Sequence, residues 1–255
     1  MITLLGVGHV FDIGGRVKEV IRDRMPNVVC IELDDYRYYA LTHKEEVKGW
    51  EPPLHMLLAA FQRRIAKMYK VEVGSEMIAA VDAAKEVGAR VAFIDMESDL
   101  VFKRIMEEMT FEEKVKFAVS LFLGFFVRKK DVERELERFQ MDSSTDMMST
   151  FGKEFPSIKR VLIDERNQYM AAIIRELGKT HERIVVVIGD GHVKGIQALI
   201  KDNFKDQVEV IRLKEVRDDN WKRLNVQAVA GAKSSEHLPP DSMARVSFSF
   251  DTWII

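Results

Sequence analysis

The sequence places two histidines in nearly the same short context, in LLGVGHV (residues 4–10) and in VVIGDGHV (residues 186–193). Each Gly-x-Gly-His follows an apolar run rich in β-branched residues, and the two histidines are His9 and His192. Glycines at the end of a strand permit a tight turn or a close approach of the backbone. We therefore expect each histidine to follow a strand and to point into a cleft.

Two further apolar runs end in carboxylates. Glu32 lies near the end of VVCIEL, and Asp95 ends RVAFID. A carboxylate beside a buried strand needs a cation or hydrogen-bond donors, or its pKa shifts. Because open parallel sheets bind ligands at the carboxyl ends of their strands, His9, Glu32, Asp95 and His192 are expected on one rim. Asp95 has an alternative role as the cap of a helix that begins near residue 97.

A charged residue interrupts the apolar stripe of IDERNQYMAAIIREL (residues 163–177). Arg166 lies one turn before Met170, on the side of the helix that carries the apolar residues. An arginine on a buried face usually pairs with a carboxylate or a bound anion, although one at a helix start can also extend to solvent. Tyr169, three residues later, shares its direction.

The elements that position these residues alternate between two periodicities. Strands are predicted at residues 2–8, 27–33, 90–95, 183–189 and 207–213. Helices are predicted at residues 13–24, 53–70, 74–86 and 193–204, with a long helical stretch at about 97–178. Nearly continuous apolar strands are typical of buried parallel sheets. The pattern predicts an α/β fold with a mainly parallel sheet of about five strands, helices on both faces and right-handed crossovers.

Two regions depart from this alternation within what we interpret as a single domain, residues 1–255. Residues 97–160 are charged and Met-rich, and we interpret them as a helical insertion that either forms a lid or caps the core. Residues 232–255 combine a polar, Pro-containing linker with the alternating run RVSFSFD, which predicts a C-terminal strand. Such a strand needs a sheet edge, in this chain or in a partner subunit.

Composition restricts the function. Of the 255 residues, 47% are hydrophobic and 31% charged, which suits one globular domain. The net charge of −2 and the lack of a basic run argue against nucleic acid. A lone cysteine, Cys30, excludes an internal disulfide. We expect a cytoplasmic protein, since the N-terminus does not read as a signal peptide.

One apolar segment, FAVSLFLGFFV at residues 117–127, is too short to span a membrane, which takes about 20 residues. It is predicted to be a buried or interface helix, and its basic flanks leave contact with a membrane surface open. Together with the C-terminal strand, it favours a homodimer.

Dinucleotide binding is a rival explanation for the first glycine motif. That fingerprint requires a third glycine where this chain has Phe11, and the second copy has Lys194 at the matching place. The match is therefore weak.

A family resemblance rests on five motifs in one order: GVGHV, PNVVCIELDDYRYYAL, GSEMIAAVDAAKEVGARVAFID, DERNQYMA and GDGHVKGI. Over residues 1 to about 213 the chain resembles the TraB family. That family includes bacterial pheromone-shutdown proteins and is related to the Tiki proteases, and more remotely to erythromycin esterases and the haem-binding ChaN proteins. Relatives often extend into a C-terminal membrane region, so this chain resembles a short form.

The resemblance implies which residues act. His9, His192 and Glu32 match the family's active-site features and would hold a divalent metal, manganese or cobalt by resemblance, with zinc an alternative. Arg37 and Arg166 match positions that would bind a carboxylate or an oxyanion. Tyr169, Asp95 and Arg104 are further candidate substrate contacts. Met96 stands where relatives often have arginine, which bears on substrate preference.

Several activities fit these residues. The first is metal-dependent hydrolysis of a peptide or a small amide or ester. A metal-free variant would use one histidine as the base, tuned by Glu32. A non-catalytic alternative is a peptide-sequestering regulator of the pheromone-shutdown type. Haem binding through the histidines rests on remote analogy alone.

Overall fold

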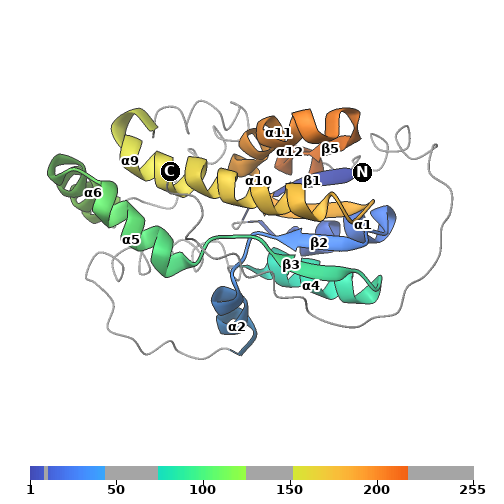
Figure 1. The fold of residues 1–255 in the computed structure, drawn as a ribbon. Helices are drawn as coiled ribbons and strands as arrows, with labels where there is room; N and C mark the ends of the chain where they lie inside the picture. The colour runs from blue at the N-terminus through green and yellow to red at the C-terminus, as the bar shows by residue number, and fades with distance from the viewer. Residues whose placement is uncertain (9–10, 44–73, 125–151, 218–255) are drawn as a thin grey trace.

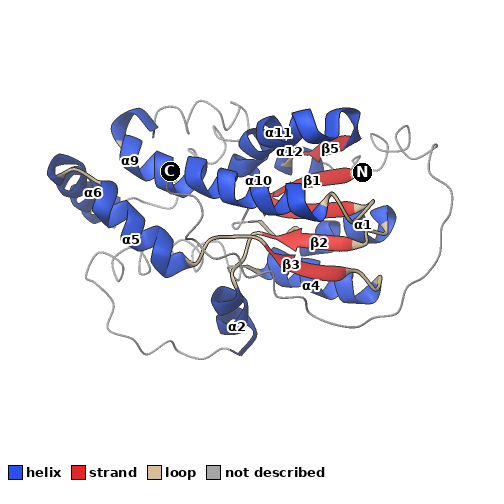
Figure 2. Ribbon diagram, in the orientation of Figure 1, coloured by secondary structure: helices blue, strands red, loops and turns tan. Residues whose placement is uncertain are grey.

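The computed structural model describes residues 1–8, 11–43, 74–124 and 152–217, and they form an α/β fold around a five-stranded parallel sheet (Figure 2). The order of the strands is β3-β2-β4-β1-β5. Their bounds are β1 Ile2–Val7, β2 Val28–Ile31, β3 Arg90–Phe93, β4 Ile184–Gly189 and β5 Val208–Ile211. The predicted fold class is thus confirmed, and every pairing in this sheet is parallel.

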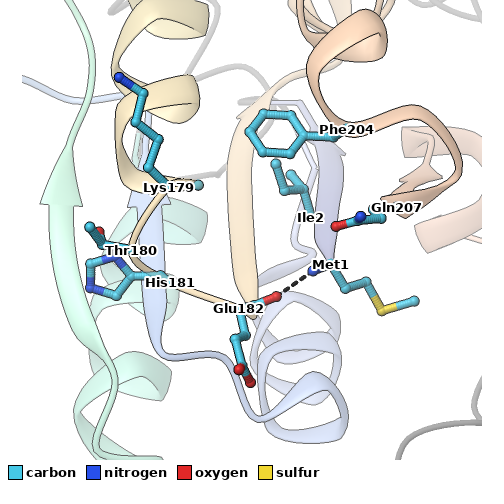
Figure 3. A pocket seen from close by; sticks show the side chains of 9 residues that line it. Met1, Ile2, Lys179, Thr180, His181, Glu182, Phe204 and Gln207 are labelled. Carbon is cyan, nitrogen blue, oxygen red and sulfur yellow. Dashed lines mark hydrogen bonds between the residues drawn. The ribbon is translucent and has the colours of Figure 1, made fainter.

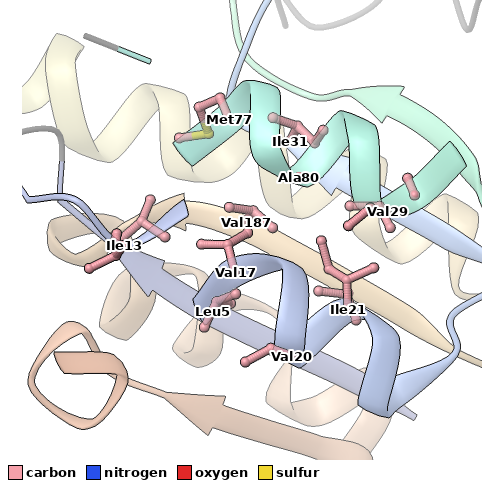
Figure 4. Close-up of a cluster of buried hydrophobic side chains, with 14 of the residues drawn as sticks. Leu5, Ile13, Val17, Val20, Ile21, Val29, Ile31, Met77, Ala80 and Val187 are labelled. Carbon is pink, nitrogen blue, oxygen red and sulfur yellow. The ribbon is translucent and has the colours of Figure 1, made fainter. Parts of the chain in front are cut away.

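Helices cover both faces of the sheet because successive strand side chains point to opposite sides. On one face Leu5, Ile31 and Val187 belong to a core with α1 (Gly14–Arg24) and α4 (Ser75–Glu86) (Figure 4). On the other face Leu4, Cys30 and Val186 belong to a core with α10 (Arg166–Leu177) and α11 (Asp190–Phe204). Alternate residues of the same strands thus serve two different cores.

A third apolar cluster lies beyond the carboxyl ends of the strands, where α5 and α6 extend away from the sheet (Figure 1). It includes Met96, Ile105, Phe155, Ile158 and Val161. The elements around this end are α2 (Asp35–His43), α5 (Ser98–Glu108), α6 (Phe111–Gly124), α9 (Pro156–Lys159) and a π-helical segment, Arg160–Glu165. Two short elements complete the described chain, a 3-10 turn at Lys205–Gln207 and α12 at Leu213–Arg217.

The strand order brings distant parts of the chain together. β4 lies between β1 and β2, so the segment after residue 183 separates the two strands that come first in sequence. The ends of β4 and β2 are adjacent: the Glu32 amide donates to the Val187 carbonyl at 3.0 Å. Glu32 and His192 therefore lie at neighbouring strand ends.

Some predicted boundaries were wrong. α11 begins at Asp190 rather than at residue 193, so His192 lies in the first turn of a helix and not in a preceding loop. β2 and β5 end two residues before their predicted ends, as does β3. The helix predicted at 53–70 and the C-terminal strand lie outside the described residues, as does much of the insertion, residues 125–151.

The segment 117–127 falls partly in α6, and its last three residues lie outside the described part. Phe117 packs edge-on against Phe155, with ring centroids 5.9 Å apart. Phe111, Val115 and Val119 of the same helix are exposed. Among the described helices, none is both long and apolar enough to cross a membrane.

Candidate active site

One guanidinium group joins the two predicted carboxylates at the carboxyl end of the sheet. Arg166 donates from Nε and Nη2 to the two oxygens of Asp95, at 2.8 and 2.7 Å, and from Nη2 to Glu32 Oε1. Burial alone would lower the pKa of Arg166, but the charges of Glu32 and Asp95 outweigh it and raise that pKa. Of the two roles left open for Arg166, the structure shows pairing with carboxylates.

His192 belongs to the same group of side chains. We call Glu32, Asp95, Arg166 and His192 the Arg166 cluster. Its Nε2 lies 3.2 Å from Arg166 Nη1 and 3.4 Å from Glu32 Oε1. The second oxygen of Glu32 accepts the Gly189 amide at 2.5 Å, which fixes the carboxylate against the end of β4. The side chains of Glu32 and His192 are each only 6% exposed, so this is a largely desolvated site.

Asn167 is a member of the site that the sequence analysis did not single out. It is buried, and its Oδ1 lies 2.8 Å from His192 Nδ1. The signal was present, because Asn167 lies three residues before Met170 on the same apolar stripe as Arg166.

The π-helical segment Arg160–Glu165 lies directly before Arg166 and Asn167. A π turn changes the phase of a helix and often occurs at functional sites. Ile158, before the segment, and Val161, within it, pack in the third cluster, whereas Met170 and Ile174, after it, pack against the sheet. Arg166 Nη1 also donates to the Leu162 carbonyl at 3.1 Å. The segment thus allows one helical run to serve two cores and still direct its charge to the strand ends.

Arg37 lies at the outer side of the cluster. Its Nη1 donates to Asp95 Oδ2 at 3.1 Å, and its side chain is 37% exposed, against 12% for Arg166. Asp34, which the sequence analysis also did not single out, stabilises the start of α2. Its carboxylate accepts hydrogen bonds from the Arg37 amide at 2.7 Å and from the Ser98 hydroxyl at 3.0 Å.

Asp95 does not cap the helix that follows it. α5 begins at Ser98 with Glu97 as its N-cap, and no side chain caps it there. The Asp95 carboxylate instead accepts the neighbouring Met96 amide at 2.8 Å together with the two arginines. The alternative of a helix cap is therefore wrong for Asp95.

The other two candidate substrate contacts differ in position. Arg104 forms an ion pair with Glu165 through two hydrogen bonds, at 2.9 and 3.1 Å. Glu165 directly precedes Arg166 in the sequence. Tyr169 packs between the second and third apolar clusters. Burial raises the pKa of Tyr169, and the charges of Asp95 and Glu97 raise it further. Its phenol therefore remains a proton donor at neutral pH.

The two glycines of the first motif, Gly6 and Gly8, permit a close approach of neighbouring side chains. A Cβ on Gly6 would lie 2.4 Å from Asp190 Oδ1. Asp190, at the start of α11, accepts Arg212 Nε at 2.8 Å and the Leu213 amide at 2.9 Å. Burial would raise the pKa of Asp190, but the bonds from Arg212 and Leu213 lower it overall. These bonds tie the first turn of α11, which carries His192, to the residues between the end of β5 and the start of α12.

The predicted metal centre is only partly described. His9 lies outside the described residues, whereas Glu32 and His192 are brought together. Within the described ranges, no three His, Cys, Asp or Glu side chains are grouped so that they could hold a metal ion. An open pocket of about 410 Å³ lies elsewhere, at the amino ends of β1 and β4, lined by residues such as Ile2, Lys179 and His181 (Figure 3). It is therefore separate from the Arg166 cluster.

The comparison with protein families matches residues 1–212 to the TraB/PrgY/gumN family model. This chain belongs to the TraB/PrgY/gumN family. The match extends from the first strand to the end of β5, so it includes every residue of the cluster.

Individual TraB relatives are distant. An uncharacterized protein of Methanocaldococcus jannaschii is 30% identical over 88% of this chain and 60% of its own length. TraB domain-containing proteins of Mus musculus and Homo sapiens are 27% and 26% identical over 77% of this chain and 61% of theirs. The chain thus spans about three fifths of the relatives it matches.

Proposed function

We propose that this chain hydrolyses a peptide bond or a related amide or ester bond at the carboxyl end of its sheet. The observation that supports the proposal is the convergence of Glu32, Asp95, Arg166 and His192, from four separate segments, in one largely desolvated cluster. Charged groups are costly to bury, and a buried cluster of ionisable groups is a candidate functional site.

In this proposal Glu32 and His192 handle the proton of the attacking water. Glu32 Oε1 and His192 Nε2 are 3.4 Å apart, so one water molecule can contact both. Glu32 can accept its proton, as general bases do, and His192 can do so once its Nε2 exchanges the hydrogen bond from Arg166 for the water. Arg166 holds the carboxylates of Glu32 and Asp95 in place, and its positive charge would also stabilise a developing oxyanion.

Arg37 is the better candidate to bind the substrate's own carboxylate. Its side chain is the more exposed of the two arginines, and it lies on the outer side of Asp95. Tyr169 supplies a half-buried phenol that can donate to the substrate.

A divalent metal fits two of the predicted ligands. Two donors on one ion, each at about 2.1 Å, are separated by roughly 3 to 3.5 Å, and the Glu32 and His192 atoms are 3.4 Å apart. His9 would be the third ligand. Such an ion would lower the pKa of bound water and polarise the carbonyl. Both donor atoms contact Arg166, so an ion has to compete with the guanidinium.

The test incubates the full chain with a peptide library, with and without Mn²⁺, Co²⁺ or Zn²⁺, and reads the products by mass spectrometry. New peptide termini that vanish in His192→Ala support hydrolysis. Intact peptides recovered in complex with the protein would contradict it and favour the sequestering regulator. If a chelator leaves hydrolysis unchanged, the proposed hydrolase activity stands and the proposed role of a metal is contradicted.

A further inference from the structure

The environment of His192 determines which of its two nitrogens carries the proton. Arg166 is permanently protonated and has no acceptor, so a hydrogen bond between its Nη1 and His192 Nε2 requires a lone pair on Nε2. A neutral imidazole then carries its proton on Nδ1. Asn167 Oδ1, at 2.8 Å, is placed to accept that proton.

We propose that Asn167 is a positioning residue that holds His192 in the tautomer protonated at Nδ1. Its Nε2 lone pair then faces Glu32 and Arg166 at the centre of the site. Hydrogen-bond partners of this kind commonly fix the tautomer and the ring orientation of functional histidines.

The helix that carries His192 is shaped around the Asn167 amide. A Cβ on Gly195, one turn after His192 on α11, would lie 2.3 Å from Asn167 Nδ2 and 3.1 Å from its Cγ. Alanine is otherwise favoured over glycine inside a helix, by about 1 kcal/mol. The glycine therefore costs helix stability and gives the amide its place between α10 and α11.

The opposite tautomer has a ready acceptor, so the choice depends on Asn167. Glu32 Oε1 lies 3.4 Å from His192 Nε2 and can accept a proton from it. Without an acceptor at Nδ1, the proton is expected to move to Nε2, towards Glu32. The lone pair that the proposed chemistry uses would then be lost.

The tautomer is measured by two-bond ¹H–¹⁵N correlation spectra of the full chain labelled with ¹⁵N-histidine, at a pH where His192 is neutral. His192→Gln identifies the signal. The wild-type protein is expected to show the Nδ1–H pattern. Asn167→Asp, which retains an oxygen acceptor, should retain it, and Asn167→Leu should shift it towards Nε2–H.

A second pair of variants tests the same contact without altering the acceptor. Gly195→Ala displaces the amide and should shift the tautomer as Asn167→Leu does. Gly191→Ala, on the same helix, is the matched control, because its Cβ would meet nothing within 4 Å among the described residues. It should leave the His192 spectrum unchanged.

The proposal is overturned if wild-type His192 is protonated at Nε2, or if Asn167→Leu and Gly195→Ala both leave the proton on Nδ1. These spectra do not require activity, so the inference and the proposed hydrolysis can fail separately. Where hydrolysis is observed, Asn167→Leu should lower kcat by about 10- to 100-fold, with rescue by Asn167→Asp.

Discussion

Two buried arginine clusters lie at opposite ends of the sheet, and they differ in how the charge is shared. Near the amino ends of β1 and β5, Arg24 meets Glu209 in a two-pronged pair at 2.8 and 2.6 Å, and Thr3 donates to the same carboxylate. At the carboxyl end, the Arg166 guanidinium shares its hydrogen bonds among Glu32, Asp95 and His192.

The difference separates a structural ion pair from a candidate active site. In the amino-end pair, one guanidinium donates two hydrogen bonds to a single carboxylate. The carboxyl-end cluster holds two carboxylates against one buried guanidinium, and its second cation, Arg37, is far more exposed. Because two carboxylates share the one buried guanidinium, a substrate or an ion can compete for binding to them.

The largest expected effect is on stability. Arg166→Met leaves two buried carboxylates facing each other and should cost about 3 to 5 kcal/mol of unfolding free energy. Arg24→Met leaves one and should cost about 1 to 3 kcal/mol. Urea denaturation at pH 7 measures both. Neutralising the orphaned carboxylates, as in Arg166→Met with Glu32→Gln and Asp95→Asn, should recover part of the loss, and equal losses in the two single variants would remove the distinction.

The next effect concerns catalysis. Glu32→Gln should lower kcat for peptide or ester hydrolysis by about 100-fold or more, because a general acid–base group contributes at least that much. Glu209→Gln removes an arginine-paired carboxylate at the other end and should retain wild-type kcat. Steady-state kinetics with one substrate compares them, and a similar loss in both would point to a folding defect.

Metal competition should produce a smaller change. Arg166→Gln frees the Glu32 and His192 donor atoms and removes a positive charge, so Mn²⁺ should bind about tenfold more tightly, roughly 1.4 kcal/mol. Arg24→Gln is the matched control and should not alter the affinity. Isothermal titration calorimetry measures both, and weaker binding to Arg166→Gln would argue that Arg166 supports the ion.

The smallest effect separates the clusters by pH. Burial would raise the pKa of Glu209, but the bonds from Arg24 and Thr3 lower it overall. Its stabilisation is therefore complete above the unfolded pKa, about 4.3, and is lost as the pH falls through the lower folded value. The stability gap between wild type and Glu209→Gln should thus be constant near neutrality and close below about pH 4. Urea denaturation from pH 7 to 3 checks this, and a gap that widens in acid would contradict it.

The sequence by itself predicted the strands, the main helices beside them and most of the candidate residues, but not α2 or α12. Apolar β-branched runs separated by helical periodicity predicted a mainly parallel sheet of about five strands, because burial on both faces requires such runs. Glu32, Asp95 and Arg166 were recognisable because each is charged within an apolar pattern. Asn167 lies on the same stripe, but an uncharged amide on an apolar face is a weaker signal than the arginine beside it.

Only the tertiary structure decided how those residues meet. The placement of β4 between β1 and β2 depends on packing between segments more than 150 residues apart, which local sequence does not encode. The same holds for the sharing of Arg166 between Glu32 and Asp95 and for the fit of Gly195 against Asn167. Local patterns identify which side chains must find partners, whereas long-range packing selects the partners.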